Sequence, residues 1–294
     1  MDRMFSAEPE KQSMMKEMIM TNCSRFEIRP FGQEECTAMT RISENVGWNQ
    51  PETEIAEVIR RSGKFMYGAF RQDRLAGTAA VYPYPGDGFA FVNEVIVHSD
   101  FRRGGAATQL LEKLIPQAAA EYPVLRLYAT DMGRPLYEKF GFQPYAKLSF
   151  LELKPSPVKT DAEITPFTQS GLPEAAALDK KNFGADRTGL LLSLMKGSPE
   201  NSWVLKRNDR VEGFIVRGPM NWVLQAEKKE DMIALILWAD AHSGSGSYPA
   251  LIYREHVKQL GVSYEEHFTL TAMQRGSALP PPAVTFSSML PDIG

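Results

Sequence analysis

The sequence contains very little cysteine and no long hydrophobic stretch. Two cysteines, Cys23 and Cys36, among 294 residues do not make a disulfide framework. No apolar run approaches the roughly 18 residues that a transmembrane helix needs. The N-terminus also lacks a compact apolar core followed by a cleavage site. We therefore expect a cytoplasmic protein with reduced thiols and no membrane partner.

An excess of one charge and clustered metal ligands are also missing. The formal net charge is −3 and no long basic block occurs, so we expect no nucleic-acid partner. The four histidines lie far apart without the spacing of metal ligands, so no metal is expected either. What remains is a chain of 294 residues with a hydrophobic content of 43%, which is typical of a globular protein of about two domains.

The chain divides into two halves with a similar order of elements. Residues 1–24 form an N-terminal extension with no assigned function. In residues 25–155 the apolar pattern predicts a strand, two helices, three strands of antiparallel type, a helix, a strand, a short helix and a closing strand. After a proline-containing linker, residues 162–294 repeat this order, and their first segment, Ala162–Phe167, resembles Phe26–Phe31. We predict a mixed α/β (α+β) fold of two related domains, each a mixed, mostly antiparallel sheet flanked by helices.

One junction in the first half has the properties of an anion site. The apolar strand Phe89–Val97 runs through two arginines and two glycines, Arg102–Gly105, into a helix with one apolar face. The first amides of a helix lack internal partners and its dipole is positive there, so an anion is favoured. The spacing is neither G-x-G-x-x-G nor a P-loop, which argues against nucleotide chemistry of those kinds. The alternative is an ordinary turn with solvated arginines.

Two segments carry a resemblance to a known family. Arg102–Ala107 reads Arg-x-x-Gly-x-Ala, which resembles the pyrophosphate loop of the GCN5-related N-acetyltransferase (GNAT) superfamily. Tyr137–Phe142 resembles the Tyr-x-x-x-Gly-Phe segment of the same family, and a strand and a helix of suitable length separate the two. Residues 25–155 are thereby identified as a GNAT domain. The runs Val46–Gln50 and Tyr128–Phe142 are also similar to tandem bacterial members of the YitH type.

The resemblance implies transfer of an acetyl group from acetyl-CoA to a primary amine, without a metal. It implies that the pyrophosphate binds at the glycine loop and that the pantetheine runs along the end of the preceding strand. The implied cofactor-binding residues are Val95, Ile96, Val97, Arg102, Arg103, Gly104, Gly105, Ala106, Ala107 and Thr108. Ser99 stands where many family members have proline. We expect the acceptor to be a small-molecule amine rather than a protein, and the enzyme to be a monomer or homodimer.

Two side chains are candidates for proton transfer. Tyr137 matches the tyrosine that lies near the thioester sulfur in the family, so it is the candidate acid toward the CoA thiolate. The alternative is that Tyr137 is a core residue of its short helix. Glu94 is the candidate base, because it lies on the strand next to the expected cofactor and could act directly or through water. Strand alternation puts it on the opposite face from Val95 and Val97. The alternative for Glu94 is a solvated or salt-bridged strand residue.

The second half lacks the glycine loop. At the corresponding place, Ala226–Asp231 contains no glycine and three acids, and acids at a helix start repel a pyrophosphate. We therefore predict that this domain has a degenerate CoA loop and that it shapes the acceptor pocket or mediates association. An active amine acetyltransferase is the first hypothesis. A CoA-binding sensor or scaffold with little catalysis is the alternative.

Overall fold

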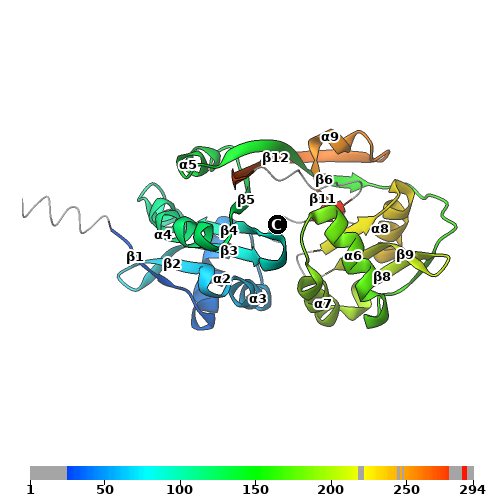
Figure 1. Cartoon of the computed structure of the whole chain (residues 1–294), viewed down its shortest axis with the longest axis horizontal. Coiled ribbons are helices and arrows are strands. Elements are labelled where there is room, and N and C mark those ends of the chain that lie inside the picture. Colours follow the sequence, from blue (N-terminus) through cyan, green and yellow to red (C-terminus); the bar gives the residue numbers. More distant parts are fainter. Residues whose placement is uncertain (1–24, 218–221, 244–245, 247, 278–286, 290–294) are drawn as a thin grey trace, which may run out of the picture. The chain divides into compact units, whose positions relative to one another are not determined.

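The computed structural model describes residues 25–217, 222–243, 246, 248–277 and 287–289 (Figure 1). The expected extension at residues 1–24 lies outside this range. The chain forms two compact units. Unit 1 consists of the residues up to Val81 together with Glu94–Ala118, and unit 2 consists of Tyr82–Asn93 and the residues from Ala119 onward. The domain boundaries expected at residues 155 and 162 stay a prediction.

Unit 1 is built from the first strands and three helices. Its strands follow one another in the sheet as β1 (Glu27–Pro30), β2 (Met66–Arg71), β3 (Arg74–Tyr84) and the end of β4 (Phe89–Val97). The first three pair antiparallel. The helices are α2 (Cys36–Val46), α3 (Glu52–Ser62) and most of α4 (Ala106–Glu121). These elements lie where the apolar periodicity predicts them.

Helix α4 continues through Pro116, although a proline inside a helix usually ends or kinks it. One face of this helix is buried, with Leu110, Leu111, Leu114, Ile115 and Ala118 in the core. Pro116 and Glu112 both lie on the exposed side, so water reaches the carbonyl group that the proline leaves without its helical donor. The packing of the leucine face therefore outweighs the lost hydrogen bond.

The large sheet of unit 2 combines strands from both halves of the sequence. It contains the start of β4, β5 (Val124–Ala129), β12 (Ser263–Gly276), β6 (Gln143–Lys154) and β11 (Pro249–Tyr253), in that order. Strand β12 pairs antiparallel with β5 on one side and with β6 on the other. With a partner on each edge, β12 extends over 14 residues. The short helices α5 (Arg134–Lys139) and α9 (Arg254–Val257) complete this part.

The second sheet of unit 2 is antiparallel and has helices on both faces. Its strands are ordered β13 (Ser287–Met289), β10 (Trp222–Ala226), β9 (Arg210–Arg217), β8 (Ser202–Arg207) and β7 (Glu163–Pro166). Val204 and Val223 pack with α6 (Leu172–Phe183) and α7 (Thr188–Gly197), whereas their neighbours Leu205 and Leu224 pack with α8 (Lys229–Ser243). From β7 to β12 the order of elements repeats that from β1 to β6. The mixed α/β, tandem architecture predicted from the sequence is thus confirmed.

Candidate cofactor and catalytic site

The end of strand β4 departs from regular strand geometry at Glu94. The backbone of Glu94 has φ +52°, a left-handed value that interrupts the alternation of the strand. Glu94 and Ile96 are buried, while Val95 and Val97 are partly exposed, as the alternation predicted. Strand β3 passes so close that a Cβ atom on Gly77 would lie 2.5 Å from the carbonyl oxygen of Ile96. A glycine at residue 77 therefore allows β4 to keep its irregular end.

The turn before α4 has the backbone geometry of an anion site. Arg103 has φ +62° and Gly105 has φ +83°, and a Cβ atom on Gly104 would lie 3.0 Å from the carbonyl oxygen of Phe101. The first helical hydrogen bond runs from the Gln109 N–H to the Gly105 carbonyl oxygen, at 3.0 Å. The N–H groups of residues 106–108 precede that bond, so they are available to a phosphate.

The side chains around this turn leave it accessible to a ligand from solvent. Arg102 and Arg103 are exposed, Ala107 and Thr108 are partly exposed, and Ala106 is buried. The cofactor-binding residues expected from the sequence thus lie together in unit 1, along the end of β4 and the start of α4. Their binding of CoA stays a prediction.

Helix α2 fixes the loop through Ser99. The side chain of Asn45 accepts the Ser99 N–H at 2.8 Å and donates to the Ser99 hydroxyl at 3.1 Å. A proline has neither group, so the serine at this position changes how the loop is held as well as how rigid it is. His98 accepts the N–H of Asp100 at 3.2 Å, which also holds the turn.

Glu94 is buried rather than solvated, with an exposed fraction of 2%. Its carboxylate accepts a hydrogen bond from the side chain of Gln50 at 3.3 Å. The hydroxyl of Thr78 donates to the backbone oxygen of Glu94 at 2.9 Å, which holds the irregular strand segment in place. Gln50 is itself buried, and no sequence pattern indicated a contact between Gln50 and Glu94. The role of Glu94 as a base stays a prediction.

Tyr137 lies on α5 in unit 2. Its ring packs edge-on against Phe142, with 6.1 Å between the ring centroids. Burial raises the pKa of the Tyr137 phenol well above its usual value, so the hydroxyl stays protonated around neutral pH. The side chain is partly exposed, so it is not fully enclosed by the core of its helix. This geometry is compatible with a proton donor, and the assignment stays a prediction.

The large sheet of unit 2 carries a cluster of polar residues that the sequence pattern did not predict. The cluster consists of Asn93, Arg126, Tyr128, Tyr145 and Tyr253, from strands β4, β5, β6 and β11. All are buried or half-buried. An asparagine inside the apolar run of β4 is an unusual residue that could have drawn attention. The tyrosines are spread over more than a hundred residues, so only the strand pairing reveals them as a group.

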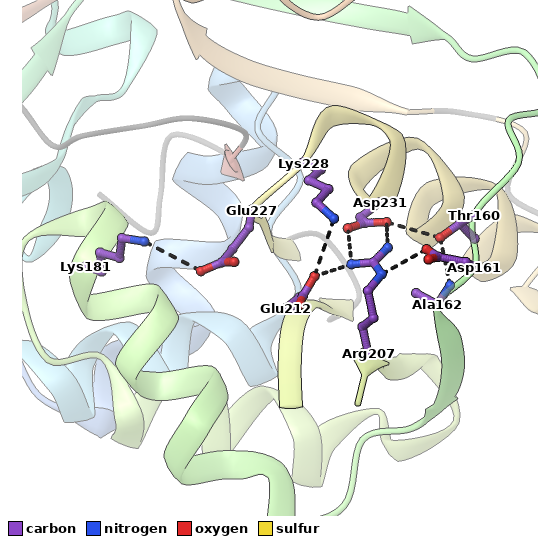
Figure 2. Close-up of polar contacts among 9 residues, drawn as sticks. All are labelled: Thr160, Asp161, Ala162, Lys181, Arg207, Glu212, Glu227, Lys228 and Asp231. Carbon is purple, nitrogen blue, oxygen red and sulfur yellow. Dashed lines mark hydrogen bonds and ion pairs between the residues drawn. The ribbon is translucent and has the colours of Figure 1, made fainter. Parts of the chain in front are cut away.

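In the second half, the segment before α8 is occupied by internal ion pairs (Figure 2). The guanidinium of Arg207 contacts Asp161 at 2.8 Å and Asp231 at 3.0 Å, and it also contacts Glu212. Asp231, in the first turn of α8, is 1% exposed and accepts a hydrogen bond from Thr160. Carboxylates thus occupy the place where the first half offers arginines and glycines.

Other site types find little support in the described residues. In the part of the chain that the structure describes, no group of three or more His, Cys, Asp or Glu side chains is placed to hold a metal ion. None of the helices within the described ranges is long and apolar enough to cross a membrane.

Comparisons with known proteins agree with this geometry. Residues 33–142 match the acetyltransferase (GNAT) family model. The chain is 27% identical over 204 residues to the uncharacterized N-acetyltransferase YitH of Bacillus subtilis (strain 168), which covers 66% of this chain and 70% of that protein. The segment that matches the family contains both the glycine loop and Tyr137.

Solved structures with a similar fold include two that match most of this chain. One is a candidate acetyltransferase from Pyrococcus horikoshii, with a TM-score of 0.72 and 19% identity, covering 89% of this chain and 92% of that one. Another is a tandem GNAT protein from the clavulanic acid biosynthesis pathway, with a TM-score of 0.61 and 10% identity, covering 87% of this chain and 100% of that one. Residues 33–142 therefore resemble the GNAT family in sequence, and the chain shares the fold of these structures.

Proposed function

We propose that this protein is an N-acetyltransferase that moves an acetyl group from acetyl-CoA to a primary amine of a small acceptor. The match of residues 33–142 to the GNAT family model supports an acyltransferase. The observation that carries the proposal is the turn before α4, where left-handed Gly105, exposed arginines and the first helical N–H groups meet. We place the enzyme in the cytoplasm, as a monomer or homodimer with no metal, nucleic-acid or membrane partner.

The cofactor is held mainly by backbone groups in this proposal. The N–H groups of Gly105, Ala106, Ala107 and Thr108 bind the pyrophosphate, and Arg102 or Arg103 adds a charge-assisted contact. The pantetheine runs along Val95, Ile96 and Val97, at the end of β4, where the left-handed backbone of Glu94 makes the strand irregular. Small side chains at Ala106 and Ala107 leave room for the phosphates.

The reaction is direct attack of the amine on the thioester carbonyl. A C–N bond forms, the C–S bond breaks, and CoA leaves as a thiolate. The amine loses one proton, for which Glu94 is the candidate base, directly or through water. Tyr137 donates a proton to the thiolate, and burial keeps its phenol protonated for that role. An apolar environment also raises the pKa of the leaving CoA thiol, which brings it closer to the raised pKa of the Tyr137 phenol.

The second domain does not bind CoA in this proposal. The ion pairs of Arg207 with Asp161, Glu212 and Asp231 support this, because they place three carboxylates near the first turn of α8. A pyrophosphate would be repelled there. We propose that the second domain shapes the acceptor pocket instead.

The proposal is tested by replacing Tyr137 with phenylalanine. We expect Tyr137→Phe to reduce kcat for acetyl transfer by about 10²-fold, the usual size of a general-acid contribution, and to leave the Kd for acetyl-CoA nearly unchanged. The readout is release of free CoA thiol with a panel of primary amines. Tyr67→Phe is the matched control, because the Tyr67 hydroxyl bonds to Gln117 at 2.6 Å within unit 1.

The pH profile adds a second readout. Because burial raises the pKa of Tyr137, its acidic form persists from about pH 7 to pH 9, and the ratio of wild-type to Tyr137→Phe rates stays constant over that range. An unchanged kcat in the variant would show that Tyr137 is not the acid. Tight acetyl-CoA binding without turnover on any amine would instead support the sensor or scaffold.

A further inference from the structure

Strands β4 and β5 stop pairing part of the way along their length. Their parallel pairing covers Phe89 with Val124, Ala90 with Leu125 and Phe91 with Arg126, although β5 continues to Ala129. Beyond Phe91 the edge of each strand is open to another group. Both sides of this opening, up to Asn93 on β4 and through Tyr128 on β5, belong to unit 2.

Asn93 lies at this opening with an unsatisfied side chain. It is 9% exposed, and neither the oxygen nor the nitrogen of its amide has a hydrogen-bond partner among the described residues. A buried amide without partners costs about 1–3 kcal/mol, so such groups persist where a ligand or water satisfies them. Alternation puts Asn93 on the same face of β4 as Phe91, whose ring packs edge-on against Tyr128 at 4.9 Å.

Three tyrosine hydroxyls gather on the same sheet. The hydroxyls of Tyr145 and Tyr253 lie 3.3 Å apart, and Tyr253 also forms a hydrogen bond with Tyr128. We call Tyr128, Tyr145 and Tyr253 the tyrosine trio. Two hydrogen bonds within the trio use two of its three hydroxyl protons, because each phenol has one proton to donate. The third proton is directed to a group outside the trio. Tyr128 and Tyr145 are partly exposed, so that group can be a ligand.

The charges that act on the trio are positive. Arg126 and Arg187 both favour the ionised form of Tyr128, and Arg126 does the same for Tyr145, although burial raises the pKa of both phenols overall. The Arg126 guanidinium lies 5.6 Å from the centre of the Tyr145 ring. Arg187 is held in place by Asp179, with contacts of 2.9 and 2.6 Å. Arg126 therefore favours a negatively charged group beside the trio and disfavours an ammonium group, while the charge of Arg187 is balanced by Asp179.

We infer that Asn93 and the tyrosine trio form a subsite for a carboxylate, so that the acceptor is an amine that also carries a carboxylate, such as an amino acid. This inference rests on the proposed acetyltransferase function. The Asn93 amide N–H₂ and the third tyrosine proton donate to the carboxylate oxygens. The amine of the same molecule is the group that is acetylated in the proposed reaction. An acceptor without the carboxylate leaves these buried donors unpaired, which is a strong basis for discrimination.

The experiment measures binding of simple carboxylates to the full-length protein loaded with CoA. Calorimetry compares butyrate and 4-aminobutyrate with butylamine, which has no carboxylate. We expect both carboxylates to bind and butylamine to bind at least tenfold more weakly, since one hydrogen bond to a charged group is worth about that factor. Asn93→Leu and Tyr145→Phe are each expected to weaken carboxylate binding by about tenfold. Tyr67→Phe, whose hydroxyl bonds elsewhere, is expected to change nothing.

The outcomes distinguish failure of the proposed acetyltransferase function from failure of the carboxylate subsite. Failure of the wild type to bind CoA would overturn the proposed function. Normal CoA binding with equal or tighter binding of butylamine, or with no carboxylate binding, would overturn the subsite alone. Unchanged carboxylate affinity in Tyr145→Phe would also overturn it. Tyr145 is partly exposed and loses one oxygen atom in this variant, so the result stands even if Asn93→Leu does not fold.

Discussion

Arg187 and Asp179 form an ion pair whose side chains are both fully buried. The guanidinium donates two hydrogen bonds to the carboxylate and stacks 3.9 Å above the ring of Phe183. Gln225 donates a further hydrogen bond to Asp179 at 3.2 Å. The carboxylate therefore fixes the arginine that acts on the tyrosine trio. A buried pair of this kind contributes little net stability, but the loss of one partner leaves an uncompensated charge in the core.

The first prediction follows from this pair. Asp179→Asn keeps the shape of the side chain and removes its charge, so Arg187 is left buried without a counter-ion. We expect a loss of about 3–5 kcal/mol in the free energy of unfolding, measured by urea denaturation. Lys180→Ala is the neighbouring control, because the Lys180 side chain is exposed although it pairs with Asp87 at 2.8 Å, and its removal is expected to change stability much less. Equal effects of the two substitutions would contradict this account.

At the scale of elements, local pattern and long-range pairing contribute different parts of the fold. The helices and most strands follow from apolar periodicity, and the glycine turn before α4 follows from its own residues. The position of β12 between β5 and β6 does not, because strand order depends on contacts far apart in the sequence. For the same reason the tyrosine trio and the contact between Gln50 and Glu94 were not predictable. The candidate site was therefore predictable on the cofactor side only.

The end of β12 provides a test of this strand insertion. Gly276 has φ +98°, and a Cβ atom there would lie 1.9 Å from the carbonyl oxygen of Pro123, at the start of β5. Gly276→Ala therefore forces β12 away from β5 at their last pair, Gly276 with Val124. We expect a clear drop in Tm, of several degrees, by thermal unfolding.

Gly189 is the matched glycine for this measurement. It lies in α7 with ordinary backbone angles, and a Cβ atom there would meet nothing within 4 Å. Gly189→Ala is expected to leave Tm unchanged or raise it slightly, because alanine favours a helix. If Gly276→Ala behaved like Gly189→Ala, close approach of β12 to β5 would not contribute to stability.

At the scale of the whole molecule, the two halves share an order of elements but differ where a helix follows the fourth strand of each half. Ahead of α4 the turn offers glycines, exposed arginines and helical N–H groups. The first turn of α8 carries Asp231 instead, and Arg207 is engaged by Asp231 and by Glu212 of β9 (Figure 2). A repeated architecture has thus kept its layers while only one copy kept the features of an anion site. The difference lies in side-chain charge and backbone angle, which a fold comparison alone does not register.

This difference predicts one acetyl-CoA site per chain. Calorimetric titration of the full-length protein should give a stoichiometry close to one, because carboxylates at the start of α8 repel a pyrophosphate, whereas the turn before α4 carries exposed arginines. Gly105→Val should abolish that binding, since a β-branched residue disfavours the φ of +83° found there. Two sites in the wild type would mean that the ion pairs around Arg207 open for a second CoA. A single site that survives Gly105→Val would place the cofactor away from the turn before α4. Only a single site that is lost in Gly105→Val agrees with acetyl-CoA binding at the turn before α4 and not in the second half.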